Sequence, residues 1–370
     1  MDRDTLYKEL ERYKDQMTAA ERSRAYAAGE EVDRLPAAIS VRETMAPLYG
    51  YSVSEYRRQF AVRAAVYQQA AREFGCHGIA IGPNLKKIGE ALGAKAVYPE
   101  QDADYLLQQP LTDYADLGAY EPPQPESNAV LKPLLDEIGR YKAHFGDGFP
   151  VKTEIGGPMS TAISIRPVEM VMADCRKHPQ ELQRLLDFSV ECQLLWVQTA
   201  HRLFGVTGVN IADPAASLNL LSPRLFRQLI LPRLRRLVEE TIRITGKRPS
   251  LHICGKTAAI WPDLATLDIA SFRVDDCESL ALLQQAAGEK IAIAGNIPPV
   301  EVMLQGSTDQ VLQAGKRCIE QASGNPMGFT LAAGCQLPPG VSRENLLAML
   351  LAARKYGRHA RKGRPCAILA

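Results

Sequence analysis

The stretch VTGVNIADPAASLNLLSPRLFRQLILPRLRRLVEETIRITGKRPSLHICG, residues 206–255, contains one complete strand–helix–strand unit. Two short apolar runs, near residues 208 and 251, flank a long amphipathic segment. Ser222 is typical of a helix N-cap, and Pro223 suits the first helical position. Because a helix of this length carries the chain from one end of a sheet back to the other, the two strands are expected to be parallel.

The same alternation of strand and helix continues along the chain. Apolar runs predict about eight strands, near residues 36, 79, 152, 208, 251, 271, 292 and 329. Short strands rich in Val, Ile and Ala are typical of a parallel sheet buried on both faces. An open doubly wound sheet is the alternative, but no G-x-G-x-x-G turn follows the first strand. The sequence therefore predicts an α/β fold, a (β/α)8 TIM barrel.

We expect this barrel to form a single domain over residues 1–370. Residues 1–30 are predicted to be an N-terminal helical extension. Residues 99–127 are rich in Pro, Asp, Gln and Tyr, and we interpret them as an excursion from the barrel that could serve as a lid.

The composition excludes several classes of protein. The 370 residues include 44 Lys and Arg and 42 Asp and Glu, a net charge of +2, so nucleic acid is not an expected partner. The first residues, MDRDTLYKELERYKDQ, are charged throughout and do not resemble a signal peptide. No apolar run reaches the roughly 18 residues of a membrane span. We expect a cytoplasmic protein, no membrane contact and eight cysteines present as thiols.

Residues that bind metals gather at the predicted strand ends. His252 and Cys254 lie two apart on one strand, so they point to the same side, and Gly255 allows the chain to turn. Cys335 follows the last predicted strand, directly after Gly334. The active site of a TIM barrel lies at this end of the strands. These three candidate ligands make a Cys2His set, typical of catalytic zinc with an open fourth position. The alternative is a core histidine with two buried thiols.

These motifs resemble a known family. HICG, followed about eighty residues later by GCQLPPG, is similar to the uroporphyrinogen decarboxylase-like methyltransferases. That group includes zinc enzymes that exchange methyl groups with corrinoid proteins. The stretches AGEEVDRLP, IADPAASLNLLSPRLF and GNIPPVEVMLQGSTDQV also match. The resemblance covers most of the chain and implies the same barrel, with His252, Cys254 and Cys335 as zinc ligands.

Two departures from the family pattern affect the expected activity. Uroporphyrinogen decarboxylases carry an Arg-rich RQAGR stretch, whereas this chain has ISVRETMAP with Arg42 alone, so porphyrinogen decarboxylation is not expected. The coenzyme M enzymes usually contain GCG where this chain has GCQLPPG, so the acceptor thiol is expected to differ, or the enzyme to use a methyl donor instead.

The resemblance implies a zinc-dependent methyl transfer between a small substrate and cobalt. Zn²⁺ would act as a Lewis acid, on a thiol acceptor or on a methyl ether or similar methylated donor. The corrinoid would be carried by a partner, a corrinoid-binding protein, because this chain lacks the D-x-H-x-x-G signature. The direction of transfer, the small-molecule donor or acceptor and the oligomeric state, monomer or dimer, stay open.

Other polar residues at the strand ends are weaker candidates. Glu154 and Asp213 could hold substrate, act as acid or base, or ligate the metal, or they could anchor loops. Asp275 or Asp276 matches an acidic position of the family and could orient the histidine ligand. Asn296 is a candidate for a cofactor contact, although we expect it first of all to shape its turn.

Three other functions remain as alternatives. The first is a metal-free decarboxylase of the uroporphyrinogen type. The second is a zinc-dependent thiol methyltransferase with a folate donor. The third is a non-catalytic barrel that binds a corrinoid or sequesters metal. Metal content and an assay with methylcobalamin separate these possibilities.

Overall fold

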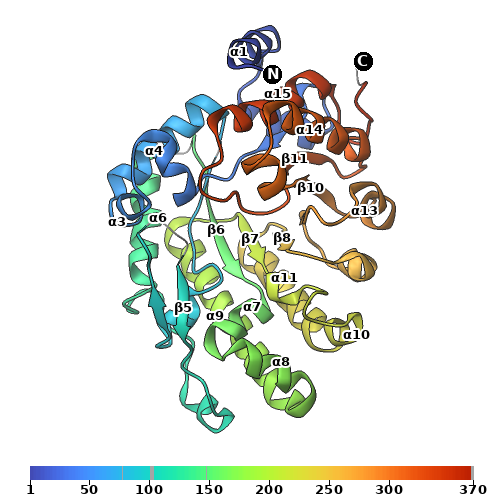
Figure 1. Ribbon diagram of the computed structural model, residues 1–370. Helices are drawn as coiled ribbons and strands as arrows, with labels where there is room; N and C mark the ends of the chain where they lie inside the picture. Colours follow the sequence, from blue (N-terminus) through green and yellow to red (C-terminus); the bar gives the residue numbers. More distant parts are fainter. Residues whose placement is uncertain (77, 101–103, 147, 368–370) are drawn as a thin grey trace. The chain divides into compact units, whose positions relative to one another are not determined.

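The central sheet of this computed structural model contains eight strands (Figure 1). The structure describes residues 1–76, 78–100, 104–146 and 148–367. The strand order in the sheet is β2-β11-β10-β9-β8-β7-β6-β3. From β3 to β11, neighbours in this sheet follow one another along the chain, and the first strand, β2, pairs with the last, β11. This order is that of a (β/α)8 barrel, which confirms the predicted fold and all eight strand positions. The strands are β2 (Ala37–Ala38), β3 (Ile79–Ala80), β6 (Val151–Gly156), β7 (Val209–Ala212), β8 (Ser250–Ile253), β9 (Ser271–Val274), β10 (Ala292–Ile297) and β11 (Phe329–Ala333).

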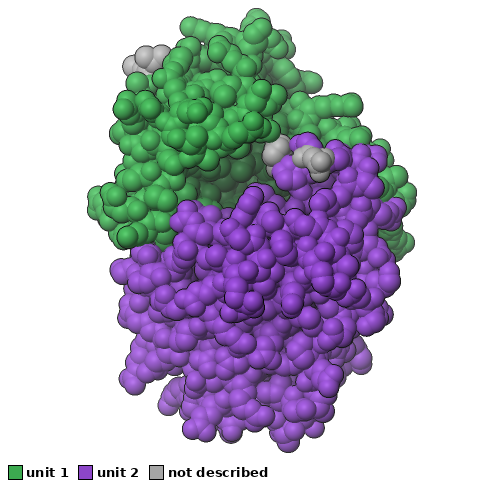
Figure 2. All heavy atoms as spheres, turned by 180° about the vertical axis from the view of Figure 1, so that it is seen from behind, with its two compact units in different colours: residues 1–77, 271–370 green, residues 78–270 purple. Residues whose placement is uncertain are grey.

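The chain divides into two compact units, which are coloured separately in Figure 2. Unit 1 comprises residues 1–77 and 271–370, and unit 2 comprises residues 78–270. Each unit contains four strands of the sheet. In unit 1, β9, β10, β11 and β2 pair in parallel. In unit 2, β3, β6, β7 and β8 do the same.

Local capping signals start several helices of unit 1. Ser307 and Gln310 form a capping box at the start of α14. Thr18 and Glu21 form another at α2, so the N-terminal extension is two helices rather than one. The helices are α1 (Arg3–Arg12), α2 (Ala19–Ala28), η1 (Glu43–Tyr49), α3 (Val53–Arg58), α4 (Phe60–Phe74), α13 (Leu280–Ala287), η6 (Pro299–Leu304), α14 (Thr308–Ala322) and α15 (Arg343–Tyr356).

Unit 1 also contains a strand pair that the sequence analysis does not predict. β1 (Val32–Arg34) pairs antiparallel with β12 (Arg358–Ala360), near the other end of the chain. The side chain of Asp15, in the turn between α1 and α2, accepts hydrogen bonds from Arg34 at 2.7 Å and Arg354 at 3.0 Å. These contacts join the N-terminal extension to the last helix of the barrel.

Unit 2 contains one helix that the sequence analysis missed, α7 (Pro158–Ile165), between β6 and α8. The Ser222 cap lies where the sequence predicts it. The remaining helices are α5 (Lys87–Ala91), η2 (Tyr114–Ala119), α6 (Lys132–Phe145), α8 (Val168–Lys177), α9 (Pro179–Phe204), η3 (Pro214–Ala216), α10 (Pro223–Leu225), η4 (Phe226–Ile230), α11 (Leu231–Thr245), η5 (Ala258–Ile260) and α12 (Trp261–Leu264).

The excursion over residues 99–127 has two parts with different anchoring. Its first part contributes to a hairpin, β4 (Lys95–Val97) with β5 (Tyr105–Gln108), and residues 101–103 of the excursion lie outside the described residues. In its second part, the Tyr114 hydroxyl donates to Asp174 at 3.0 Å, and the Arg166 guanidinium lies 4.2 Å from the Tyr114 ring. A role of the excursion as a lid stays a prediction.

Among the helices of the described residues, none combines the length and the apolar character that a membrane span requires.

Candidate metal centre

Two of the candidate ligands come from the end of β8 in unit 2. Leu251 and Ile253 are fully buried, and the alternation of a strand therefore places His252 and Cys254 together on its other face. The two side chains are half-buried, and His252 Nε2 lies 3.0 Å from Cys254 Sγ. The backbone carbonyl of His252 accepts a hydrogen bond from Asp213 N at 2.8 Å, which extends the ladder between β7 and β8.

The turn after Cys254 needs a glycine. Gly255 has a φ of +71°, and a Cβ at this position would lie 2.4 Å from Asn219 Oδ1 and 2.7 Å from Ser217 Oγ. Asn219 Oδ1 also accepts a hydrogen bond from Lys256 N at 2.7 Å. The loop after β7 thus holds the loop that carries Cys254.

The third candidate ligand, Cys335, follows β11 in unit 1. Arg273, in the middle of β9, donates to the carbonyl oxygens on both sides of Gly334: Ala333 O at 2.9 Å and Cys335 O at 2.7 Å. A Cβ on Gly334 would lie 2.6 Å from Asp276 N, so the turn packs closely against the loop after β9. The backbone that bears Cys335 is therefore held by hydrogen bonds and by close packing.

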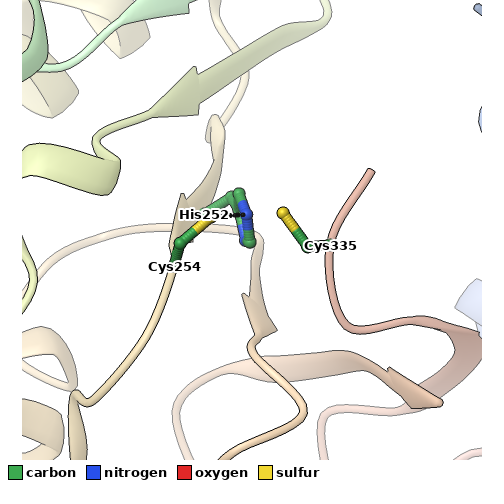
Figure 3. A group of neighbouring side chains, drawn as sticks. All are labelled: His252, Cys254 and Cys335. Carbon is green, nitrogen blue, oxygen red and sulfur yellow. Dashed lines mark hydrogen bonds between the residues drawn. The ribbon is translucent and has the colours of Figure 1, made fainter. Parts of the chain in front are cut away.

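His252, Cys254 and Cys335 form the one group of three potential metal ligands among residues 1–76, 78–100, 104–146 and 148–367 (Figure 3). Their ligand atoms all lie within 4.8 Å of one another. Zn–N and Zn–S bonds in a tetrahedral site place neighbouring ligand atoms about 3.5–3.8 Å apart, so the donor set fits zinc with little adjustment. One imidazole and two thiols are also the soft ligands that zinc prefers over Mg²⁺ or Ca²⁺.

Asp213 lies directly after β7 and is fully buried. Its carboxylate accepts hydrogen bonds from the backbone amides of Ser160 at 2.7 Å and Met159 at 3.3 Å, in the first turn of α7. Burial raises the pKa of Asp213 to about 6, against the lowering effect of those hydrogen bonds. In this position the side chain caps α7, and a direct catalytic role stays a prediction.

Glu154 lies within β6, opposite Asn210 of β7, between the buried residues Thr153 and Ile155. Its backbone carbonyl accepts a hydrogen bond from Asn84 N at 3.1 Å. The half-buried side chain is on the face of β6 opposite to Thr153 and Ile155. Its contact with substrate or metal stays a prediction.

The loop after β9 contains the other candidate carboxylates. Asn296, on β10, donates from Nδ2 to Asp275 O at 3.0 Å and to Glu278 O at 2.8 Å, so both donors of its amide hold this loop. The Asp275 side chain accepts from Cys277 N at 3.1 Å. Burial and the neighbouring Asp275 raise the pKa of Asp276. The cofactor contact of Asn296 and the catalytic or orienting roles of the two aspartates stay predictions.

Sequence reasoning missed the residues that support the ligands. Arg273 places a charge between two buried apolar residues of the strand SFRV, and a charge in such a position is a signal that the side chain has a particular partner. Asn219 and Ser217 gave no such signal, because polar residues are ordinary in loops.

Comparisons with known proteins agree with the resemblance in the motifs. The chain is 26% identical over 274 residues to the methylcobamide:CoM methyltransferase MtaA of Methanosarcina barkeri, which covers 74% of this chain and 78% of that protein. It is 23% identical over 345 residues to the methylated-thiol–coenzyme M methyltransferase of Methanosarcina mazei, covering 92% and 90%. The solved structure of a methyltransferase from Methanosarcina mazei has the same fold, with a TM-score of 0.77 at 23% identity over 91% of this chain and 98% of that chain. The sequence profile described as Uroporphyrinogen decarboxylase (URO-D) matches residues 18–356. The resemblance is thereby confirmed, and the chain belongs to the uroporphyrinogen decarboxylase family.

Proposed function

We propose that the protein is a zinc-dependent methyltransferase that moves a methyl group between a small substrate and the cobalt of a corrinoid. The small substrate is a thiol acceptor or a methylated donor such as a methyl ether, and a separate corrinoid-binding protein carries the corrinoid. The names of two relatives, a methylcobamide:CoM methyltransferase and a methylated-thiol–coenzyme M methyltransferase, support methyl transfer.

The observation that carries the proposal is the donor set of His252, Cys254 and Cys335, whose ligand atoms lie within 4.8 Å of one another. Three protein ligands would leave the fourth position of a tetrahedral zinc to the substrate. Bound zinc would supply Lewis acidity, which stabilises a coordinated thiolate near neutral pH or polarises the heteroatom of a methylated donor.

The chain's own residues would hold and orient the reacting groups. The β8 ladder and the Gly255 turn fix two ligands, and the turn after β11 presents the third. Glu154, Asp213, Asp275 and Asp276 remain candidates for substrate contacts or for orienting His252, and Asp213 also caps α7. In the direction of thioether formation, a sulfur–carbon bond forms and the cobalt–carbon bond breaks. Its electron pair stays on cobalt, and the proton of the thiol passes to solvent.

Metal analysis tests this proposal first. The wild-type protein, expressed with ample zinc, is compared with His252→Ala, Cys254→Ala and Cys335→Ala by inductively coupled plasma mass spectrometry. Cys366→Ala is the matched control, because Cys366 is a half-buried thiol outside the ligand group. We expect about one zinc per chain in wild type and control, and loss of zinc in the three ligand variants. A wild-type protein without zinc would refute the proposal and favour a metal-free decarboxylase.

Activity is then measured under anaerobic conditions. Methylcobalamin is incubated with a panel of small thiols, and Co(I) formation is followed by absorbance. The reverse reaction uses Co(I) cobalamin with methyl ethers and methyl thioethers. Transfer in the wild-type protein and the Cys366→Ala control, absent in Cys335→Ala, is the expected result. Zinc binding without transfer in either direction would point to a metal-sequestering protein or to a folate donor.

A further inference from the structure

A guanidinium group lies in the middle of β9, a strand whose neighbouring residues Phe272 and Val274 are fully buried. We propose that Arg273 is a positioning residue for the third zinc ligand: it sets the backbone of the Cys335 turn and, through it, the position of the Cys335 thiolate. This inference rests on the proposed zinc site and is argued from the hydrogen bonds that Arg273 donates to the backbone around Cys335.

The guanidinium holds two carbonyl groups that bracket one glycine. Arg273 Nε and Nη2 donate to Ala333 O at 3.1 and 2.9 Å, and Nη2 also donates to Cys335 O at 2.7 Å. The guanidinium is planar and its donors have a fixed geometry, so these bonds restrict the orientation of the peptide group before Gly334 and of the peptide group after Cys335. The path of the chain from the end of β11 to Cys335 is thus defined by one side chain from another strand.

The sheet leaves room for Arg273 to reach this turn. β10 lies between β9 and β11, so two strand spacings of about 4.8 Å each separate Arg273 from its partners. Ala294 of β10 is in register with Arg273 and therefore presents its methyl group on the same face. A larger residue at position 294 would occupy the space beside the arginine stem.

The turn has a second support. A Cβ on Gly334 would lie 2.6 Å from Asp276 N and 3.1 Å from Asp276 Cβ. That loop is itself held by Asn296, which donates to Asp275 O at 3.0 Å. The turn that carries Cys335 is therefore supported by the guanidinium and by a loop that Asn296 holds, and loss of the guanidinium removes one of these two supports.

The expected consequence is a loss of metal affinity rather than of the fold. Residues that orient metal ligands without touching the metal typically contribute a factor of about 10–100 in affinity. In Arg273→Met the stem remains but the donors are gone, so we expect zinc to bind about 10–100-fold more weakly. Arg273→Lys keeps the charge but not the planar fork, and we expect an intermediate loss.

The test measures zinc affinity by competition with a chromophoric chelator for the wild type, Arg273→Met and Arg273→Lys. Arg233→Met is the matched control, because Arg233 is a largely buried arginine that pairs with Asp187 on helices of unit 2. A double variant, Arg273→Met with Cys335→Ala, asks whether the arginine acts through the cysteine. Co²⁺ binding gives a second readout, because the thiolate-to-cobalt charge-transfer absorption reports how many cysteines ligate the metal.

The proposal predicts that Arg273→Met weakens zinc binding and lowers the charge-transfer absorption of the Co²⁺ protein toward that of Cys335→Ala. In the double variant, Arg273→Met should cause no further loss of zinc affinity beyond that of Cys335→Ala. Wild-type affinity in Arg273→Met, or an equal loss with and without Cys335, would overturn it. If Arg273→Met does not fold, the Lys variant, with and without Cys335→Ala, decides by the same criteria. A wild-type protein that binds no zinc would instead refute the proposed function itself.

Discussion

Breaking the ion pair between Arg166 and Asp174 tests how firmly the excursion over residues 99–127 is anchored in unit 2. The two charged side chains are 5% and 4% exposed, and Arg166 Nε lies 2.8 Å from Asp174 Oδ2. Arg166 also donates to Thr112 O at 2.6 Å, in the second part of the excursion. We predict that Asp174→Ala strongly destabilises unit 2, because it leaves a buried guanidinium without its counter-charge.

The expected loss of unfolding free energy is large because both charged side chains are buried. Removing one partner of a buried pair costs about 3–5 kcal/mol, whereas replacing both by apolar residues of similar volume can be close to neutral. The double variant Arg166→Met with Asp174→Leu still loses the hydrogen bond to Thr112 O, about 1 kcal/mol. We therefore expect the double variant to be more stable than Asp174→Ala by about 2 kcal/mol or more.

Urea unfolding followed by tryptophan fluorescence is the assay, because both tryptophans of the chain, Trp196 and Trp261, lie in unit 2. Asp136→Ala is the control: its partner Lys132 and Asp136 are 53% and 57% exposed, and such a pair contributes about 0.3–0.5 kcal/mol. Limited proteolysis within 104–127 should accelerate in Asp174→Ala. If Asp174→Ala costs no more than Asp136→Ala, the buried pair does not anchor the excursion.

Three further predictions concern a turn, a thiol and a helix cap. Gly255→Ala should weaken zinc binding at least tenfold, as measured by chelator competition. The residue has a φ of +71°, and a Cβ there would lie 2.4 Å from Asn219 Oδ1. Unchanged zinc binding would show that the turn adjusts freely. Partial burial of the thiol and the Asp275 carboxylate raise the pKa of Cys277 to about 12, although the residue as a whole is exposed. Alkylation of Cys277 by iodoacetamide at pH 8 should therefore be much slower than that of free cysteine, and its rate should increase as the pH rises toward 12. Fast alkylation of Cys277 at pH 8, located by peptide mass mapping, would contradict this. Ser307→Ala removes one half of the capping box of α14 and should lower the unfolding free energy by about 1 kcal/mol in urea titrations, while an unchanged midpoint would mean that the cap is not needed.

Much of the fold follows from patterns that neighbouring residues create. Seven of the eight strands of the sheet, all except β2, end near Gly, Pro or Asp, and the long helices between strands repeat their apolar residues with helical spacing. The caps at Ser222 and Ser307 are also local, because each side chain bonds to an amide three residues away. These interactions are visible in the sequence because they join residues that are close along the chain.

The helix α7 shows where local reasoning fails. Its N-cap, Gly157, has no side chain, and its amides are capped by Asp213 from the end of β7, more than fifty residues away. No spacing rule connects these two positions, since only the pairing of β6 with β7 brings them together.

In the candidate metal centre too, one part follows from the sequence and another part only from the tertiary structure. The sequence alone determined that His252 and Cys254 share a face of one strand, because side chains of a strand alternate, and the family resemblance implied Cys335 as their companion. Only the tertiary structure decided how the Cys335 turn is held. The register of β9, β10 and β11 places the Arg273 guanidinium on carbonyl groups sixty residues farther along the chain. The physical reason is that strand alternation is a property of the local backbone, whereas the partners of a long side chain depend on which strands pair and in which register.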